Sequence, residues 1–193
     1  MFSGIIEKKA KILNVENWIY TVENIFKKPL KTWISIAHDW ACMTITESTP
    51  EKYSFFVMEE SIKKTNFKNK KVWDVFNIEW SLKLSDTMDW HFVSGHIDTT
   101  WEVTKIIENS DSSKYYHIKF DSKYSNLIIE KWSITINGVS LTIVDDLWDI
   151  FSVSIIPLTQ KITNIWNLKI LDTVNLEFDI LAKYINKLQL NKK

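Results

Sequence analysis

The sequence contains no arginine and a single cysteine, and it is poor in glycine. Its 24 lysines balance 24 acidic residues, so the charge pattern excludes a basic nucleic-acid surface and an acidic tail. Cys42 alone excludes an internal disulfide and a cysteine-based zinc site, and it fits a reducing compartment. The N-terminus lacks a signal-peptide pattern, and no apolar run approaches the roughly 20 residues of a membrane span. We therefore expect a cytoplasmic protein that acts on a small molecule.

The shortage of glycine is matched by an excess of tryptophan. A soluble chain of this length carries about 14 glycines at the average usage of about 7%, and this one has 3 glycines and 10 tryptophans. Trp18, Trp40 and Trp90 each follow Asn or Asp, whereas Asn-Gly and Asp-Gly are the usual type I′ hairpin turns. A tryptophan in such a turn carries about 1–3 kcal/mol of backbone strain. Tryptophan thus stands where turn chemistry favours glycine.

The chain contains an internal repeat. Residues 35–79 align with residues 133–177 at a constant offset of 98, without a gap, and 13 of the 45 pairs are identical. A weaker match joins FSGII at residues 2–6 to VSGHI at residues 93–97. In the main alignment HDWACMT (38–44) faces INGVSLT (136–142), so that Trp40 corresponds to Gly138. The repeat predicts two homologous domains, residues 1–88 and 89–178, followed by residues 179–193.

Within each repeat, apolar residues alternate with polar ones, as in SITINGVSLTIV (133–144) and YSFFVM (53–58). This period of two, rich in β-branched and aromatic residues and broken by turn signals about every ten residues, is typical of short β-strands. Short strands at such spacing favour a closed barrel or a sandwich. We predict an all-β fold made of two tandem, homologous, closed barrels of Greek-key type, plus a C-terminal α-helix.

The last segment has a helical period. In DILAKYINKLQ, residues 179–189, apolar side chains recur at helical spacing and form one stripe, which consists of Ile180, Leu181, Tyr184, Ile185 and Leu188. Two interpretations stay open. In one, the stripe caps the barrel of its own chain; in the other, it joins the chain to further copies as an oligomerisation helix.

Several separated motifs together resemble the bacterial riboflavin synthase family, whose members have two barrels. They are MFSGI at the start, the paired segments HDWACMT and NGVSLT, and SGH at residues 94–96, and the resemblance covers essentially the whole chain. In that family, glycine is usual at the positions of Trp33, Trp40, Trp73, Trp90 and Trp132. We infer that most of these tryptophans arise from UGA codons that the host reads as glycine. The alternative is a divergent, tryptophan-rich protein.

The resemblance implies a dismutation reaction. Two molecules of 6,7-dimethyl-8-ribityllumazine exchange a four-carbon unit and give riboflavin and 5-amino-6-ribitylamino-2,4-pyrimidinedione. No metal or redox cofactor is implied, because one substrate is both donor and acceptor. Each barrel is expected to bind one lumazine, and orientation of the two substrates is expected to supply much of the catalysis. The family arrangement further implies a homotrimer in which the N-terminal barrel of one subunit faces the C-terminal barrel of another.

The resemblance also implies two sets of substrate-binding residues, whose backbone groups and small polar side chains bond the pyrimidine edge and the ribityl hydroxyls. In the N-terminal pocket they are Gly4, Ile5, Ile6, Ser35, Cys42, Met43, Thr44, Phe56, Val57, Met58, Glu59, Glu60 and Ser61. In the C-terminal pocket they are Gly95, His96, Ile97, Lys131, Ser140, Leu141, Thr142, Ser154, Ile155, Ile156, Pro157, Leu158 and Thr159.

The catalytic candidates follow from the chemistry of the lumazine. One lumazine must lose a proton from its C7 methyl group, and the other must accept a nucleophile at C7, which are tasks for imidazole, thiol and hydroxyl groups. A lone cysteine is usually a small buried hydrophobe, but Cys42 and Ser140 occupy matching positions of the two repeats. We place near the reacting atoms His96, Ser140, Cys42 and Thr142, with His91 and Ser35 as secondary candidates.

Three positions depart from the family pattern. Asn137 and Phe56 stand where aspartate is common, and Leu158 follows a proline where a polar residue is usual. Asn137 keeps the turn and its hydrogen bonds but lacks the charge that an acid-base role would need. Phe56 and Leu158 change individual substrate contacts and leave the fold unaffected.

Two other functions use a related barrel. A non-catalytic lumazine- or flavin-binding accessory protein is expected to have a degraded second pocket, whereas His96, Lys131, Ser140 and Thr142 are all present here. A flavin-dependent reductase would need a nucleotide-binding domain. The sequence has no glycine-rich phosphate-binding fingerprint, even with every tryptophan read as glycine. The enzyme is therefore the predicted function.

Overall fold

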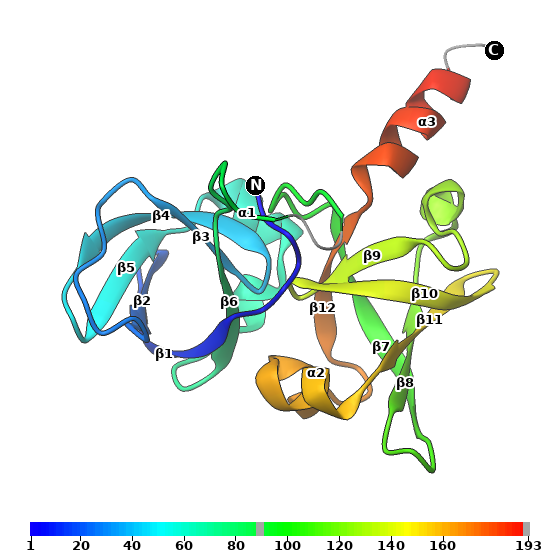
Figure 1. The fold of residues 1–193 in the computed structure, drawn as a ribbon, viewed down its shortest axis with the longest axis horizontal. Coiled ribbons are helices and arrows are strands. Elements are labelled where there is room, and N and C mark those ends of the chain that lie inside the picture. The colour runs from blue at the N-terminus through cyan, green and yellow to red at the C-terminus, as the bar shows by residue number, and fades with distance from the viewer. Residues whose placement is uncertain (88–90, 191–193) are drawn as a thin grey trace.

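The computed structural model describes residues 1–87 and 91–190 and shows two closed, six-stranded, antiparallel barrels, with a helix that extends away from the second barrel (Figure 1). The predicted fold class is confirmed. The first barrel consists of β1 (Lys8–Glu16), β2 (Ile19–Glu23), β3 (Ser35–His38), β4 (Ala41–Ser48), β5 (Lys52–Phe56) and β6 (Val75–Trp80), with α1 (Glu59–Lys64) and the 3-10 turn η1 (Asn66–Asn69). The second consists of β7 (Thr99–Glu108), β8 (Lys114–Lys119), η2 (Ser122–Leu127), β9 (Ser133–Ile136), β10 (Val139–Leu147), β11 (Ile150–Ile155), α2 (Pro157–Ile162), η3 (Asn164–Asn167) and β12 (Thr173–Phe178), and α3 (Ile180–Leu190) follows it.

The two barrels have the same topology. Neighbouring strands run β1-β2-β5-β4-β3-β6 in the first and, at the equivalent positions, β7-β8-β11-β10-β9-β12 in the second. The irregularities repeat as well, because β4 shifts register between Ile45 and Glu47 and β10 shifts between Ile143 and Asp145. These two bulges are 98 residues apart in the chain. The sequence repeat is therefore a repeat of complete barrels.

Each barrel closes around its own apolar core, because side chains alternate between the two faces of every strand. In β4, Met43 and Ile45 are buried in the first core, while Cys42 and Thr44 point to the opposite face. Leu141 of β10 takes the place of Met43 in the second core. The polar residues of the paired motifs are thereby left on the outer faces of the barrels.

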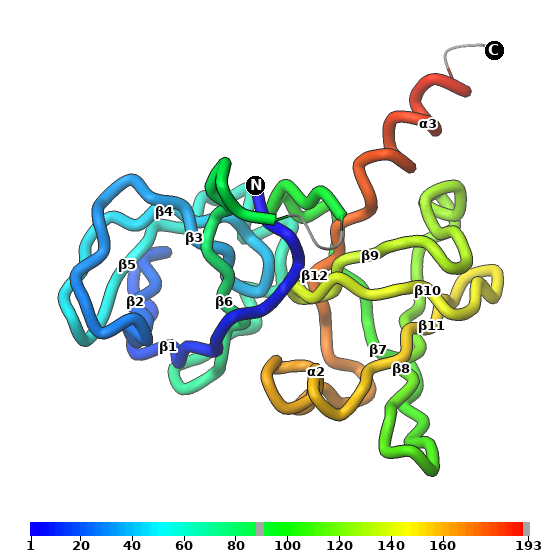
Figure 2. The backbone as a smooth tube through the Cα atoms, viewed as in Figure 1, coloured from blue at the N-terminus to red at the C-terminus, as the bar shows by residue number. Residues whose placement is uncertain are grey.

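The segments that lead into the two barrels cross over. Phe2 N donates to the carbonyl of Val93 at 2.9 Å, and Val93 N donates to the carbonyl of Phe2 at 3.4 Å. Beyond this bridge, Ile6 enters the core of the second barrel, although it precedes β1 of the first. Ile97, which precedes β7, packs against the core of the first barrel. The chain trace shows the N-terminal segment running between the barrels (Figure 2), and each barrel is thus completed by the other repeat.

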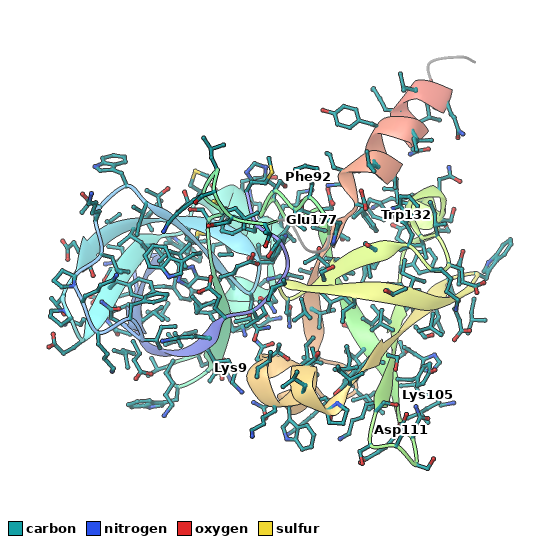
Figure 3. The ribbon with its side chains drawn as sticks, in the orientation of Figure 1. Lys9, Phe92, Lys105, Asp111, Trp132 and Glu177 are labelled. Carbon is teal, nitrogen blue, oxygen red and sulfur yellow. The ribbon has the colours of Figure 1, made fainter. Side chains whose placement is uncertain are left out.

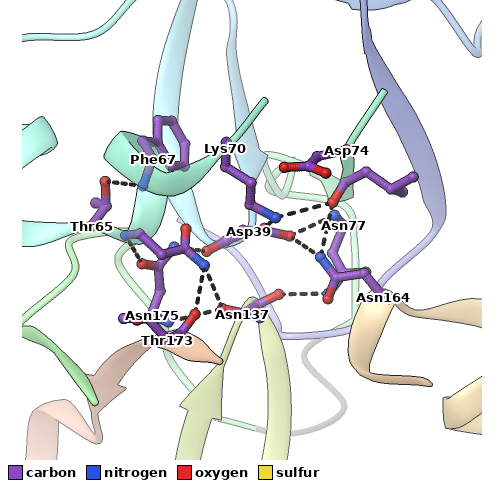
Figure 4. A network of polar contacts seen from close by, with 12 residues as sticks. Asp39, Thr65, Phe67, Lys70, Asp74, Asn77, Asn137, Asn164, Thr173 and Asn175 are labelled. Carbon is purple, nitrogen blue, oxygen red and sulfur yellow. Dashed lines mark hydrogen bonds and ion pairs between the residues drawn. The ribbon is translucent and has the colours of Figure 1, made fainter. Parts of the chain in front are cut away.

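Buried amide and carboxyl side chains join the barrels in a nearly symmetric pattern (Figure 4). Asn77 Nδ2 donates to the carbonyl of Asn137 at 2.8 Å, and Asn175 Nδ2 donates to the carbonyl of Asp39 at 2.8 Å. The two halves of this pattern are related by the 98-residue offset. We call this set the interface cluster, and its members are Asp39, Asn66, Asn77, Asn137, Asn164 and Asn175.

Among the tryptophans that the structure describes, five have the positive φ that favours glycine. At the positions equivalent to Trp33 and Trp73, Lys131 and Leu171 also have positive φ, so this backbone shape belongs to the fold. Trp132 is not among the described residues with positive φ, and Trp90 lies outside the described residues. The five are Trp18 (65°), Trp33 (70°), Trp40 (85°), Trp73 (78°) and Trp148 (69°).

Trp40 combines a glycine-type backbone with a buried ring. The turn at residues 39–40 has φ values of 42° and 85°, and the equivalent turn at residues 137–138 has 45° and 86°. Its ring is not exposed as a turn residue usually is: Trp40 is 1% exposed, packs edge-on against Phe2, and donates from Nε1 to Glu177 Oε2. Glycine at this position would relieve strain but would also remove a packed ring. Exposed tryptophans give a clearer test.

The C-terminal helix forms as predicted, but it does not cap its own barrel. Figure 1 shows α3 extending away from both barrels. The side chains of Leu181, Tyr184, Ile185 and Leu188 are 54 to 64% exposed. Asp179 Oδ1 accepts a hydrogen bond from Leu181 N at 2.8 Å and so caps the first turn. The apolar stripe is therefore uncovered in the single chain. Within the described ranges, no helix is both long and apolar enough to cross a membrane.

We predict that Trp73→Gly and Trp148→Gly each stabilise the protein. Both rings are largely exposed, at 70% and 87%, and both residues have positive φ. Glycine should therefore remove backbone strain with little loss of packing. The free energy of unfolding, measured by urea denaturation, should rise by about 1 kcal/mol for each variant.

Trp101→Gly is the control for this prediction. Trp101 lies in β7, is not among the residues with positive φ, and packs against Phe120 with ring centroids 5.4 Å apart. Glycine there should lower the free energy of unfolding by about 3 kcal/mol. If Trp73→Gly and Trp148→Gly also lost stability, the glycine interpretation of the tryptophans would be wrong.

Candidate functional site

The predicted catalytic residues lie on two outer strand faces, one on each barrel. On β4, Cys42 is half-buried and Thr44 is exposed, and Ser35 of β3 pairs directly with Thr44. On β10, Ser140 and Thr142 hold the corresponding positions. We call these surfaces the Cys42 face (Ser35, Cys42 and Thr44) and the Ser140 face (Ser140 and Thr142). Strand alternation places all five side chains away from the cores.

Each face is partly covered by the crossing segment of the other repeat. Cys42 N donates to the carbonyl of Gly95 at 3.0 Å, and Ser140 N donates to the carbonyl of Gly4 at 2.9 Å. Both glycines have a φ of 79°, and a Cβ atom on Gly4 would lie 2.5 Å from the Cβ atom of Ser140. Only glycine allows so close an approach. His96 follows Gly95 and is exposed next to the Cys42 face.

This arrangement corrects the predicted grouping of the pocket segments. The family resemblance implied that residues 4–6 accompany Cys42 and that residues 95–97 accompany Ser140. The structure instead places residues 4–6 against Ser140 and residues 95–97 against Cys42. An alignment of repeats shows which residues are equivalent, but it does not show which barrel a leading segment packs against.

A histidine adjoins the Ser140 face. His91 is buried, its Nδ1 lies 2.8 Å from Ser140 Oγ, and its Nε2 lies 3.3 Å from Thr135 Oγ1. Burial lowers the pKa of His91, and the charges of Asp179 and Glu177 oppose this shift. Burial thus favours the neutral imidazole, which can accept the hydroxyl proton of Ser140 while Nε2–H donates to Thr135. The structure thus brings this secondary candidate into direct contact with Ser140.

The two faces differ in chemistry although they share a backbone. Cys42 is a free thiol where the second repeat has the hydroxyl of Ser140. Ala37 pairs with Cys42 where Thr135 pairs with Ser140. Ser140 is connected through His91 to the buried hydroxyl of Thr135, whereas no such chain of groups is found at Cys42 among the described residues, so the two faces present different acid-base chemistry to a ligand.

Buried Glu79, which the sequence analysis did not single out, holds the first crossing segment. Its Oε1 accepts from Ser3 N at 2.6 Å and from Ser3 Oγ at 2.8 Å, and its Oε2 accepts from Gly4 N at 3.1 Å. Burial raises the pKa of Glu79 to about 7, and the hydrogen bonds from Ser3 and Gly4 oppose that rise. Glu79 and Glu177 are an identical pair at the 98-residue offset, and a Ser-Gly pair occurs in both segments. These two matches are the signals in the sequence from which a role for Glu79 and Glu177 could have been predicted.

The remaining predicted residues divide by exposure. Residues 56–61 run from the end of β5 into α1, and residues 154–159 run from the end of β11 into α2. β5 and β11 are the strands next to β4 and β10 respectively. Lys131 directs its Nζ to the carbonyl of Val144 at 2.9 Å. Five predicted side chains are buried in the cores, so that only their backbone groups can contact a ligand: Ile6, Met43, Val57, Leu141 and Ile155. Five others are large, apolar and exposed: Ile5, Phe56, Met58, Ile156 and Leu158.

A cavity of about 420 Å³ between the barrels lies away from both faces. It is lined by the interface cluster residues Asn66, Asn137 and Asn164 together with Lys70 and neighbouring residues. None of the predicted site residues lines it. Thr44, His96 and Thr142 are exposed, so the Cys42 face and the Ser140 face are open surfaces in the single chain.

Both repeats match one domain family. Residues 3–81 and residues 94–179 each match the lumazine binding domain. The chain is 39% identical to the riboflavin synthase of Actinobacillus pleuropneumoniae, over 100% of this chain and 91% of that protein. It is 34% identical to the riboflavin synthase of Escherichia coli (strain K12), over 93% of this chain and 87% of that protein. It is 33% identical to that of Bacillus subtilis (strain 168), over 96% and 88%.

Solved structures of the protein LumP have a similar fold. LumP complexed with 6,7-dimethyl-8-(1'-D-ribityl) lumazine has a TM-score of 0.82 to this chain and is 20% identical to it, over 92% of this chain and 99% of that chain. LumP complexed with riboflavin has a TM-score of 0.82 at 21% identity, with the same coverage. At such low identity the likeness shows the fold alone.

Proposed function

The chain belongs to the riboflavin synthase family, and we propose that it carries out the family's dismutation at sites shared between two copies of the chain. Two molecules of 6,7-dimethyl-8-ribityllumazine give one riboflavin and one 5-amino-6-ribitylamino-2,4-pyrimidinedione. The observation that carries the shared site is the pair of equivalent, open faces, one on each barrel, with Cys42 and Ser140 at matching positions. Two similar faces suit a reaction between two identical substrates.

The Ser140 face is suited to remove a proton from the C7 methyl group of one lumazine. Ser140 Oγ accepts this proton while its own hydroxyl proton passes to Nδ1 of His91, 2.8 Å away. Burial lowers the pKa of His91 and so favours the neutral imidazole, which has a lone pair to accept this proton. Thr135 steadies the ring from the Nε2 side. A positioned imidazole and hydroxyl of this kind contribute general acid-base catalysis.

The Cys42 face is suited to hold the second lumazine, which accepts a nucleophile at C7. The thiol of Cys42 and the imidazole of His96 are the reactive groups there, and Thr44 adds a hydroxyl. A single free cysteine fits a reducing compartment, so we propose that the protein acts in the cytoplasm. Holding both substrates at fixed orientation converts a reaction between two molecules into one within a complex.

The open faces and the uncovered stripe of α3 support a homotrimer. An apolar stripe of four exposed side chains on one helix marks a surface that another chain covers. A trimer built around three such helices brings the Cys42 face of one subunit to the Ser140 face of the next. Each of the three resulting sites would hold two lumazines, one from each face.

Purified protein supplied only with the lumazine should form riboflavin, with two substrates consumed for each riboflavin made. The expected ratio follows from the four-carbon transfer, and absorbance and fluorescence of the flavin measure it. The protein needs no added metal or redox cofactor for this conversion. Stoichiometric binding of the lumazine without riboflavin would instead assign the chain to the non-catalytic accessory proteins.

Mixing two inactive variants should restore activity if the sites are shared. Cys42→Ala and Ser140→Ala each disable one face of every subunit, but a mixed trimer contains sites whose two faces are both intact. After subunit exchange at equal amounts, about a quarter of the sites should be intact. The rate of riboflavin formation, compared with each parent, measures the recovery. No recovery after demonstrated exchange would mean that the site lies within one chain.

Removal of α3 by truncation after Asp179 should give monomers with lower activity, as judged by light scattering and by riboflavin formation. A finer test compares Leu188→Lys with Asn186→Lys. Leu188 belongs to the exposed stripe, whereas Asn186 lies on another side of the same helix. The first variant should dissociate because it places a charge in the helix contact, and the second should remain trimeric. A truncated chain that stays trimeric would show that the barrels make the assembly.

A further inference from the structure

A buried carboxylate on the second barrel binds the segment that carries His96. Glu177 of β12 is 2% exposed, and Figure 3 shows it where the two barrels meet. Its Oε1 accepts from Ser94 N at 2.8 Å and from Ser94 Oγ at 2.7 Å. Its Oε2 accepts from Gly95 N and from His96 N, each at 3.0 Å. Three successive main-chain N–H groups therefore converge on one side chain.

We propose that Glu177 is a positioning residue of the dismutation: it fixes the main chain of residues 94–96 and so sets where the imidazole of His96 stands beside Cys42. This proposal rests on the proposed function of the Cys42 face. Glu177 is buried, and it acts on the Cys42 face through His96, whose N–H it binds. Its charge also acts on His91, where it opposes the lowering of the pKa by burial.

The segment is held from both sides. On one side the N–H groups of Gly95 and His96 bind Glu177, and on the other the carbonyl of Gly95 accepts from Cys42 N at 3.0 Å. Ser94 Oγ also accepts from His96 N at 3.2 Å. These bonds connect Glu177 through two residues to the strand that carries the thiol. A shift of the carboxylate would move His96 relative to Cys42.

Glu79 binds the leading segment at the Ser140 face in the same way, through hydrogen bonds from a Ser-Gly pair, with one difference. We call this arrangement of a buried glutamate and a Ser-Gly pair a clamp. Glu79 binds Ser3 and Gly4, and the next residue is Ile5 instead of a histidine. The clamp is thus a feature of both repeats, but only Glu177 holds a segment with a side chain capable of proton transfer. Glu79 therefore serves as the matched comparison for Glu177.

Glutamine at position 177 tests the role of the carboxylate without a change of size. The two oxygens of the carboxylate accept from five donors, the four on residues 94–96 and Trp40 Nε1, whereas glutamine directs an NH₂ group at some of them. The segment must then shift, and displacements of about 1 Å at a reacting group cost on the order of 100-fold in rate. We expect kcat of Glu177→Gln to fall about 100-fold while KM changes less than about threefold, because lumazine contacts on the two faces remain.

A double-mutant cycle separates positioning from a general structural effect. If Glu177 acts through His96, then adding Glu177→Gln to His96→Ala should lower kcat by less than about threefold further. Adding Glu79→Gln to His96→Ala should instead produce the full effect that Glu79→Gln has alone. Thermal unfolding of each variant is measured in parallel. If Glu177→Gln does not fold, Ser94→Ala replaces it in the cycle, because that change removes only the Oγ bonds.

Two results would overturn the proposal. Either Glu177→Gln keeps the wild-type kcat, or its effect is undiminished in the His96→Ala background. The wild-type protein distinguishes these failures from a failure of the proposed function. If the wild type forms riboflavin and the cycle shows no coupling, then only the role of Glu177 is wrong. If the wild type binds lumazine without forming riboflavin, then the proposed function fails and the role of Glu177 in it fails as well.

Discussion

Buried polar groups hold the two barrels at one relative orientation, and the placement of both faces depends on them. Asp39 is fully buried in the interface cluster, where burial raises its pKa and the ion pair with Lys70, at 2.5 Å, opposes the rise. At the equivalent positions the second barrel has Asn137 and Leu168, so the charge and its partner are absent together. A buried charge is costly unless it is paired. The two repeats therefore share one hydrogen-bond pattern, and only the first adds an ion pair to it, between Asp39 and Lys70. Without Lys70, the buried carboxylate of Asp39 would be unpaired and would weaken the interface between the barrels.

Because the interface is fixed, the segment before each barrel can pack against the other barrel: residues 4–6 against the second and residues 95–97 against the first. Ile6 and Ile97 each complete the core of the opposite barrel, and Gly4 and Gly95 lie against its outer face. If the barrels moved relative to each other, these segments would have to leave their cores and lose buried apolar contacts. This crossing of the segments thus makes each face a joint product of both repeats. Neither barrel alone would present a complete face, which is a physical reason for the two repeats to stay in one chain.

The sequence was sufficient to predict the repeated barrels, the terminal helix and the turns with positive φ, because these depend on periodicity and local backbone geometry. The matched turn at Trp40 and Gly138 is the clearest example. It was not sufficient for the crossing of the segments, because packing against the other barrel leaves no periodic signal. His91 was underrated because it lies outside the aligned repeat. The buried ring of Trp40 was missed because turn chemistry describes a backbone and does not show what space is free beside it.

A dismutation requires two identical molecules to react in different ways, and the differences between the repeats are located where that requirement applies. In both repeats a buried glutamate binds the leading segment, a glycine of that segment lies against the opposite barrel, and the reactive residues occupy equivalent strand positions. The side chains on the faces differ: the second repeat has Ser140 with Thr135 and His91, and the first has Cys42 with Ala37. A symmetric dimer of a single barrel would present two identical faces and could not treat its substrates differently. A tandem repeat allows each face to diverge while the shared framework keeps both substrates in matching orientations, so that proton removal and nucleophilic attack can be assigned to different lumazines.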